Sequence, residues 1–325
     1  MSAPGSVASS IAAAVAVAVL AACNPFGLPA TRALENGVAG MLTSAKSFEI
    51  AGTYTSAGTA WTIDLQVTRP SSRHVVVSSA TEKVEAIIVG PQAYFRGQEF
   101  LAKHLGSDAL SQSLAMAAGN AWWKDSVSLV PALSDLTEGD LFRTAFLGSA
   151  VTQRTDDQNV GGADAVELSG TRADVFIATT APYRLLRIHL KKGVTVDSIQ
   201  DADLRYSNVD RDFGITAPAD VIDFANLSTL PPVYTVVSVD ASACGSRCVV
   251  AAKLKNIGGI SGARAPSTVT FTMVDAVSKQ PLGTCQATVQ PDVGYNSTTT
   301  VSCTIAAQAT NAAVVTASAD NPGRG

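Results

Sequence analysis

The sequence has few of the side chains that most often carry chemistry. It holds three histidines, its aromatic content is 6%, and only 15% of its residues are charged. The histidines, His74, His104 and His189, are scattered along the chain without the spacing of a metal site. Neither a G-x-S-x-G nucleophile elbow nor a phosphate-binding loop occurs. We therefore expect a protein that is not an enzyme and that uses no cofactor and no metal ion.

Charge excludes a nucleic-acid-binding protein, and hydropathy excludes a membrane helix after the N-terminal segment. The formal net charge of −4 and the pI of about 5.4 provide no basic surface for nucleic acid. After the N-terminal segment, no apolar run reaches the roughly 20 residues that a membrane helix needs. The hydrophobic content of 46% is nevertheless high enough for packed cores, and 325 residues predict two domains.

The N-terminal segment carries the strongest motif. Its apolar run, Ile11 to Ala22, is too short to cross about 30 Å of hydrocarbon and fits the apolar region of a cleavable signal. It ends in Leu20-Ala-Ala-Cys23, which resembles a bacterial lipobox. The resemblance implies that residues 1–22 are a signal peptide and that Cys23 receives palmitate. No Lys or Arg precedes the run, and an uncleaved N-terminal helix is the alternative.

Periodicity predicts mixed α+β structure in residues 31–230, after a tether over residues 23–30. Apolar residues at helical spacing predict a helix over 31–46, and further helices are expected over 98–105, 108–118 and 141–146. Most of the remaining segments alternate as strands do. Trp61, Ile63, Leu65 and Val67 alternate with polar residues, so one face of that strand is buried against a sheet, a helix or a ligand.

Two of the apolar features can be assigned to faces. In the helix over 108–118, for which Ser107 is the expected N-cap, Leu110 and Leu114 are predicted to face inward. Trp122 and Trp123 are neighbours in an extended segment, so they point to opposite faces and at most one of them lines a cavity.

Pro231-Pro232 divides the chain and predicts an accessible linker that a protease can cut. All three histidines and all three tryptophans precede it, whereas four of the five cysteines follow it. Residues 233–319 show short alternating strands separated by turn signals, which predict a β-sandwich. The tail after residue 319 is expected to be loose.

The four later cysteines predict two disulfides in an exported chain. Folding residues 285–305 as a hairpin about Gly294 places Cys285 opposite Cys303, within reach of a disulfide after a small shift. That leaves Cys244 with Cys248. A zinc site is the alternative, but Cys285 and Cys303 lie far from the Cys244–Cys248 pair, and no histidine is nearby.

Residues 31–230 resemble the LolA-like half-barrel lipoproteins of the actinobacterial LppX/LprG type. The resemblance rests on the lipobox, the helix-then-strand start, the segments 61–67, 92–97 and 204–210, and the Trp122-Trp123 pair. It implies a curled antiparallel half-barrel with packed helices that encloses a lipid cavity. The residues expected to line that cavity are Trp61, Ile63, Leu65, Val67, Leu110, Leu114, Phe142 and Phe146.

The second domain resembles CARDB-type immunoglobulin-like modules through residues 250–259. The fold class expected is thus mainly β, a half-barrel followed by an immunoglobulin-like sandwich. The function expected is that of a lipoprotein anchored at the extracytoplasmic face of the cell membrane, which binds or transports a lipid or another amphiphile. The alternative is a structural or interaction protein of the cell envelope, whose sandwich docks a protein partner.

Overall fold

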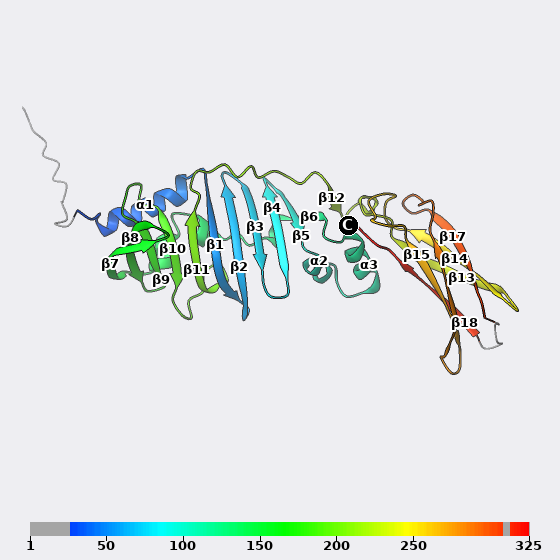
Figure 1. Ribbon diagram of the computed structural model, residues 1–325. Coiled ribbons are helices and arrows are strands. Elements are labelled where there is room, and N and C mark those ends of the chain that lie inside the picture. The colour runs from blue at the N-terminus through cyan, green and yellow to red at the C-terminus, as the bar shows by residue number, and fades with distance from the viewer. Residues whose placement is uncertain (1–26, 308–312, 325) are drawn as a thin grey trace, which may run out of the picture.

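The computed structural model describes residues 27–307 and 313–324 of the chain. Strands hold far more of this part than helices do, and the helices are short, which confirms the predicted mainly β class. Figure 1 shows an elongated molecule with a large sheet at one end and two small sheets at the other. The predicted signal peptide and Cys23 lie outside the described residues.

Twelve strands form the large sheet, in the order β12-β6-β5-β4-β3-β2-β1-β11-β10-β9-β8-β7. Neighbours are antiparallel, except that β12 runs parallel to β6. The edge strands β7 and β12 do not pair with each other, so the sheet stays open. The strands are β1 (Ser47–Ser56), β2 (Thr59–Thr68), β3 (Ser72–Ser78), β4 (Lys83–Val89), β5 (Gln92–Arg96), β6 (Trp122–Ser126), β7 (Val151–Val160), β8 (Ala163–Gly170), β9 (Ala173–Ala178), β10 (Leu185–Leu190), β11 (Gln200–Ser207) and β12 (Val221–Asp223).

Three α-helices form close to where the sequence predicts them, α1 (Thr31–Ser44), α2 (Gln98–Leu105) and α3 (Ala109–Ala118). The single-turn helix α4 (Ser134–Thr137) was not predicted. The predicted N-cap of α3 is wrong by one residue, because the Asp108 carboxylate, not Ser107, accepts hydrogen bonds from the first backbone N–H groups. The helix predicted over 141–146 is a π-helical turn over Arg143–Leu147.

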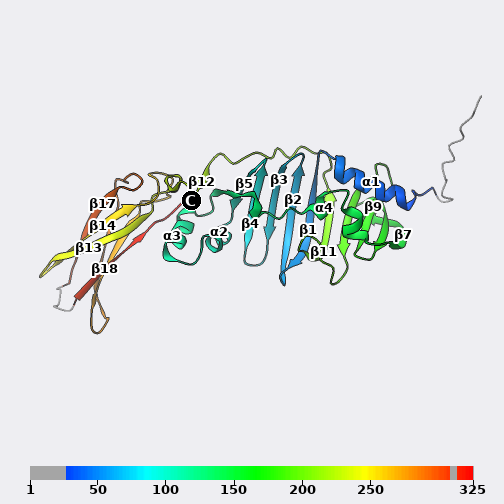
Figure 2. The ribbon, with the colours of Figure 1, turned by 180° about the vertical axis from the view of Figure 1, so that it is seen from behind.

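Helices cover the inner face of the sheet at two separate places. Over β1, β2 and β8–β11, the cover consists of α1, α4 and the π-helical turn, whose apolar side chains share one core with those strands. Over β4–β6 and β12, the cover consists of α2 and α3, which belong to a second core. Figure 2 shows α4 in front of the β1 and β11 region and α2 farther along the sheet. A stretch of the inner face over β2–β4 lies between the two covers.

The predicted inward face of α3 is wrong for Leu110, which is 50% exposed, whereas Leu114 packs against the second core while partly buried. The fully buried residues of the helix are Ala115, Ala117 and Ala118, whose small side chains allow its backbone to approach its neighbours closely.

The second unit consists of two three-stranded sheets that enclose one core. One sheet has the order β13-β14-β17 and the other β16-β15-β18. Their strands are β13 (Tyr234–Cys244), β14 (Cys248–Asn256), β15 (Thr268–Asp275), β16 (Pro281–Thr288), β17 (Thr298–Ile305) and β18 (Ala313–Asp320).

The disulfides are Cys244–Cys248 and Cys285–Cys303, the two pairs that the sequence predicts. The hairpin offered as the reason for the second pair is wrong. Cys285 lies on β16, which pairs with β15, whereas Cys303 lies on β17, which pairs with β14. This disulfide therefore joins an edge strand of one sheet to an edge strand of the other, and residues 289–297 connect the two sheets.

The connection between the two units is buried, contrary to the expected accessible linker. Pro231 and Pro232 are both buried, and Leu230 and Val233 belong to the core beneath α2 and α3. The backbone N–H of Gly259 donates to the carbonyl of Leu230 at 2.9 Å. Protease cleavage at the proline pair is therefore not expected.

The C-terminal tail is docked rather than loose. It returns to the junction, as Figure 1 shows, where the N–H of Arg324 donates to the carbonyl of Ala117 at 3.0 Å. Gly323 has φ +68°, and a Cβ there would lie 2.4 Å from the carbonyl oxygen of Met116. Only glycine fits this close approach without a shift of the backbone.

Asn256 joins the junction to the second unit through four hydrogen bonds. Its fully buried side chain accepts from the N–H groups of Val233 and Gly258, and donates to the carbonyls of Gly259 and Val293 at 2.7 and 2.6 Å. We expect Asn256→Ala to lower the free energy of unfolding by about 2–4 kcal/mol, because each buried group left unpaired costs about 1–3 kcal/mol. Urea denaturation measures the change.

The matched control for Asn256→Ala is Asn226→Ala. Asn226 is exposed and bonds only Ser228 with its side chain, so the loss expected there is below about 1 kcal/mol. Equal losses in the free energy of unfolding would mean that the buried hydrogen bonds of Asn256 stabilise the protein no more than the exposed ones of Asn226.

Arg324→Ala is expected to loosen the tail without unfolding either unit. The guanidinium of Arg324 pairs with Asp220 and donates to the carbonyl of Thr229. Asp220 is largely exposed, so the ion pair itself contributes at most about 1 kcal/mol. We expect faster hydrogen exchange at the backbone N–H groups of residue 324 and of Arg264, which donate to the carbonyls of Ala117 and Gly323. Unchanged exchange at both would show that the side chain does not hold the tail.

Candidate functional site: an apolar pocket on the inner face of the sheet

A pocket of about 460 Å³ lies on the inner face of the large sheet. It is lined both by Leu136 of α4 and by Phe100 of α2, so it occupies the gap between the two helical covers. Its volume lies within the roughly 300–1,000 Å³ of small-molecule sites. The apolar side chains that line it are Tyr54, Ala57, Trp61, Ile63, Val75, Val77, Val84, Ala86, Phe95, Phe100, Leu129, Val130, Pro131, Leu133, Leu136 and Ile199.

Three neighbouring strands form the floor of the pocket. Ile63 of β2 is registered with Val77 of β3, which is registered in turn with Val84 of β4. Registered residues on antiparallel strands point to the same face, with Cβ atoms about 4.5–5.5 Å apart. The floor is therefore a continuous aliphatic surface, extended toward β1 by the registered pair Tyr54 and Trp61.

Residues 129–136 form the opposite wall. This segment is held near α4, where Arg73 donates to the carbonyl of Ala132 and the N–H of Leu136 donates to Asp197 at 3.1 Å. Leu133 takes the left-handed conformation, with φ +52°, as the chain enters α4. Leu129 lines the pocket while 36% of it stays exposed to solvent. The wall is thus apolar on its pocket side and open to solvent at one end.

An aromatic cluster closes the α2 end. The ring of Phe95 lies 4.9 Å from that of Trp123 and 6.0 Å from that of Phe100, measured between centroids. The His104 ring also stacks on Trp123, with 5.3 Å between the ring centroids. Phe95 and Phe100 face the pocket, while the fully buried Trp123 lies behind them. Such packing makes this end rigid.

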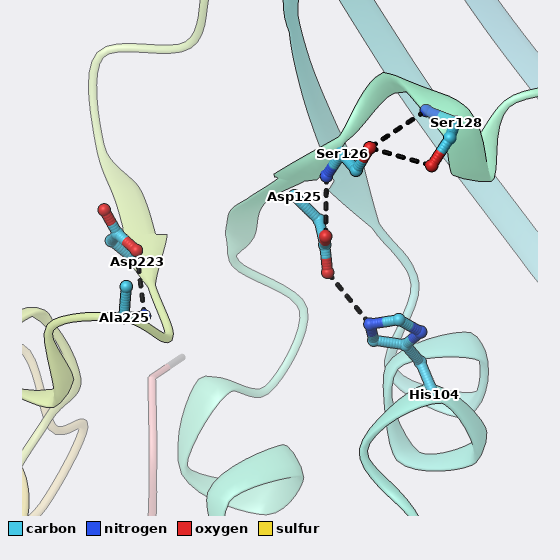
Figure 3. A network of polar contacts seen from close by, with 6 residues as sticks. All are labelled: His104, Asp125, Ser126, Ser128, Asp223 and Ala225. Atoms are coloured by element: carbon cyan, nitrogen blue, oxygen red, sulfur yellow. Dashed lines mark hydrogen bonds and ion pairs between the residues drawn. The ribbon is translucent and has the colours of Figure 1, made fainter.

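A polar network fixes the orientation of the His104 ring (Figure 3). His104 Nε2 is 2.9 Å from an Asp125 carboxylate oxygen, and the other carboxylate oxygen accepts from the N–H of Ser126. The Ser126 hydroxyl contacts the Ser128 hydroxyl at 2.8 Å. Among the described hydrogen bonds, neither hydroxyl contacts His104, so these residues do not form a serine-histidine-aspartate triad. The network positions an aromatic ring for stacking.

Polar residues gather at one end of the pocket, where the β1–β2 and β3–β4 turns lie. They are Ser56, Thr59, Glu82, Asp197 and Ser198. The pKa of Asp197 is raised, first by burial and then by the like charges of Asp135 and Glu138, although backbone N–H groups oppose the shift. Glu82 forms an ion pair with Lys103. The pocket is therefore apolar inside and acidic at this rim.

The eight residues expected to line a cavity lie in three different places. Trp61 and Ile63 line the pocket. Leu65 and Val67, farther along the same strand face, are buried in the core beneath α1, and so are Phe142 and Phe146. Leu110 and Leu114 lie on α3, away from the pocket lining.

Most of the floor and the covering wall are not among the residues that the sequence predicts for the cavity. Val75, Val77 and Val84 lie on segments that the sequence predicts as strands, but no face was assigned to them. The run Val-Val-Val over 75–77 has no alternation, so its pattern gives no face. The face of Val77 follows from its pairing with Ile63 on the neighbouring strand, which the sequence does not show.

Charged and aromatic side chains lie together on the outer face of the sheet at β4–β6. The Arg96 guanidinium lies 4.7 Å from the centroid of the Trp122 ring, while Trp123 points into the core. The two tryptophans therefore point to opposite faces, as predicted. Glu85 bonds both Arg96 and His74 there.

Over residues 27–307 and 313–324, no cluster of His, Cys, Asp and Glu suits a metal ion, and no helix is long and apolar enough to cross a bilayer.

No protein-family profile matches this chain, and no curated protein sequence matches it. Among solved structures, it is similar to MucB, described as "Crystal structure of MucB in complex with MucA(peri)". The similarity covers 74% of this chain and 85% of that chain at 13% identity, with a TM-score of 0.26. A TM-score this low does not establish a shared fold.

Proposed function

We propose that this protein is a non-catalytic lipoprotein of the cell envelope that holds one lipid or other amphiphile at the outer face of the cell membrane. The observation that carries the proposal is the pocket, whose floor and covering wall are apolar. A cavity lined by such groups is poorly hydrated and accepts hydrocarbon. The lipobox that ends at Cys23 supports the location.

The pocket suits the apolar part of the ligand. Each methylene moved from water into the pocket contributes about 0.8 kcal/mol, so six of them contribute roughly 5 kcal/mol before the costs of association. The aliphatic floor at Ile63, Val77 and Val84 receives the chain, and the rigid rings of Phe95 and Phe100 limit how far it reaches. The polar rim leaves the ligand's polar end near solvent.

Binding without chemical conversion is the activity proposed. The rim offers carboxylates and hydroxyls, but none of the described hydrogen bonds pairs a rim hydroxyl with a histidine that could activate it. The amphiphile would thus leave the pocket in the same chemical form in which it entered.

Fluorescence titration tests the proposal. The mature chain with Cys23→Ala needs no detergent, so phenylnaphthylamine, which brightens in apolar surroundings, can be titrated directly. We expect a saturable rise at one site per chain that decanol reverses by competition. The absence of any saturable rise would favour the alternative, an interaction protein whose large sheet is only a scaffold.

A further inference from the structure

The charged groups at the pocket are all of one sign. Among the described residues that line it, two are carboxylates, Glu82 and Asp197, and none is Lys, Arg or His. The hydroxyls of Ser56 and Ser198 lie at the same end, where the Ser56 hydroxyl donates to the carbonyl of Ser198 at 3.3 Å. A polar group that enters this end therefore meets acceptors and negative charge.

The cations nearby are engaged elsewhere. Lys103 pairs with Glu82, and its side chain is 69% exposed, so it lies on the solvent side of the rim. Arg73 is close enough for Asp197 to act on its charge, but it donates to the carbonyl of Ala132 in the covering wall and does not line the pocket. Asp135 and Glu138 add negative charge around Asp197. With Arg69, whose charge also acts on Arg73, the three cations nearby face the four carboxylates of Glu82, Asp135, Glu138 and Asp197, and none of these cations lines the pocket.

We propose that the pocket selects amphiphiles by the charge of their polar end, preferring an amine or ammonium end and disfavouring an anionic one. The inference rests on the proposed function, because it names the ligand class of the same pocket. A cationic end gains attraction from Asp197 and Glu82. An anionic end would face Asp197 in a partly buried site, where like charges repel more strongly than in water.

Asp197 is the group through which this selection can be tested. Its carboxylate accepts the N–H of Leu136 at 3.1 Å, and an asparagine oxygen can accept the same hydrogen bond. Asp197→Asn therefore removes the charge with little change of shape. Asp64→Asn is the matched control, because Asp64 lies on β2 but is exposed on the outer face of the sheet.

The experiment compares decylamine, decanol and decanoate by isothermal titration calorimetry at pH 7, using the mature chain with Cys23→Ala. We expect decylamine to bind about tenfold or more tightly than decanoate, with decanol between them. Asp197→Asn should reduce that ratio to about threefold or less, by weakening the binding of decylamine and strengthening that of decanoate. Asp64→Asn should keep the wild-type ratio.

The outcomes separate the two claims. If none of the three ligands binds, the proposed function fails. If decanol binds but decylamine and decanoate bind equally, or decanoate binds best, the pocket is real and the charge selection is overturned. An unchanged ratio in Asp197→Asn would also overturn it, since Asp197 is the unpaired carboxylate on which the selection rests.

Discussion

Val77→Trp is expected to abolish amphiphile binding while the protein stays folded. Val77 lies in the middle of the pocket floor, between Ile63 and Val84, and is only partly buried. An indole at this position occupies the volume that a ligand chain needs, and strands tolerate tryptophan well. We expect the affinity for phenylnaphthylamine to fall about a hundredfold or more, equivalent to about 2.7 kcal/mol.

Val76→Trp provides the matched control. Val76 precedes Val77 on the same strand and is also partly buried, but it points to the outer face, in register with Asp64 and Glu85. The same substitution there should leave binding unchanged. Circular dichroism melts of both variants establish that they fold. A folded Val77→Trp that binds as tightly as the wild type would show that the ligand does not enter this pocket.

Cys23→Ala is expected to remove the membrane anchor. In the proposed lipoprotein, the acyl chains on Cys23 are what hold the mature chain to the bilayer, and a single acyl chain binds only marginally and reversibly. Without Cys23 no acyl chain is attached. We expect a clickable palmitate analogue to label the wild type and not the variant. The mature variant should also leave the membrane fraction without detergent.

Asn24→Ala is the control for this experiment, because it changes the next residue and keeps the lipobox. It should be labelled and retained like the wild type. Incorporation of the palmitate analogue into Cys23→Ala would contradict lipidation at this residue.

Local patterns were sufficient to predict much of the fold. The helical spacing of Leu34, Val38, Met41 and Leu42 predicts α1, because those side chains form the stripe that the sheet buries. The alternation from Trp61 to Val67 predicts β2 and its inward face for the same reason. Both signals depend on which residues are apolar within one element, and that information is present in the sequence.

The pocket could not be predicted in this way, because it depends on where two covers end. Ile63 and Leu65 lie on the same face of the same strand, yet Ile63 lines the pocket while Leu65 is 1% exposed in the core. No pattern within β2 distinguishes them. The difference comes from the place of α4 and of residues 129–133 above the strand, which is set by contacts far apart in the sequence.

The second unit shows a related difficulty. Cys285 and Cys303 are 18 residues apart and form a disulfide, which is the pattern expected for two paired strands of a hairpin. The chain between them instead crosses from one sheet to the other, and both arrangements bring the sulfur atoms together. The cysteine pairing was therefore predictable, whereas the strand pairing of β16 and β17 was not.

The most direct test of amphiphile binding is native mass spectrometry of the mature Cys23→Ala chain, incubated with a lipid extract of the cell envelope and then freed of unbound lipid. We expect a species heavier than the polypeptide by one amphiphile, and we expect Val77→Trp, treated in the same way, to carry none. A wild-type pocket that yields only the mass of the bare polypeptide, or equal loading of wild type and Val77→Trp, would contradict a binding role for the pocket.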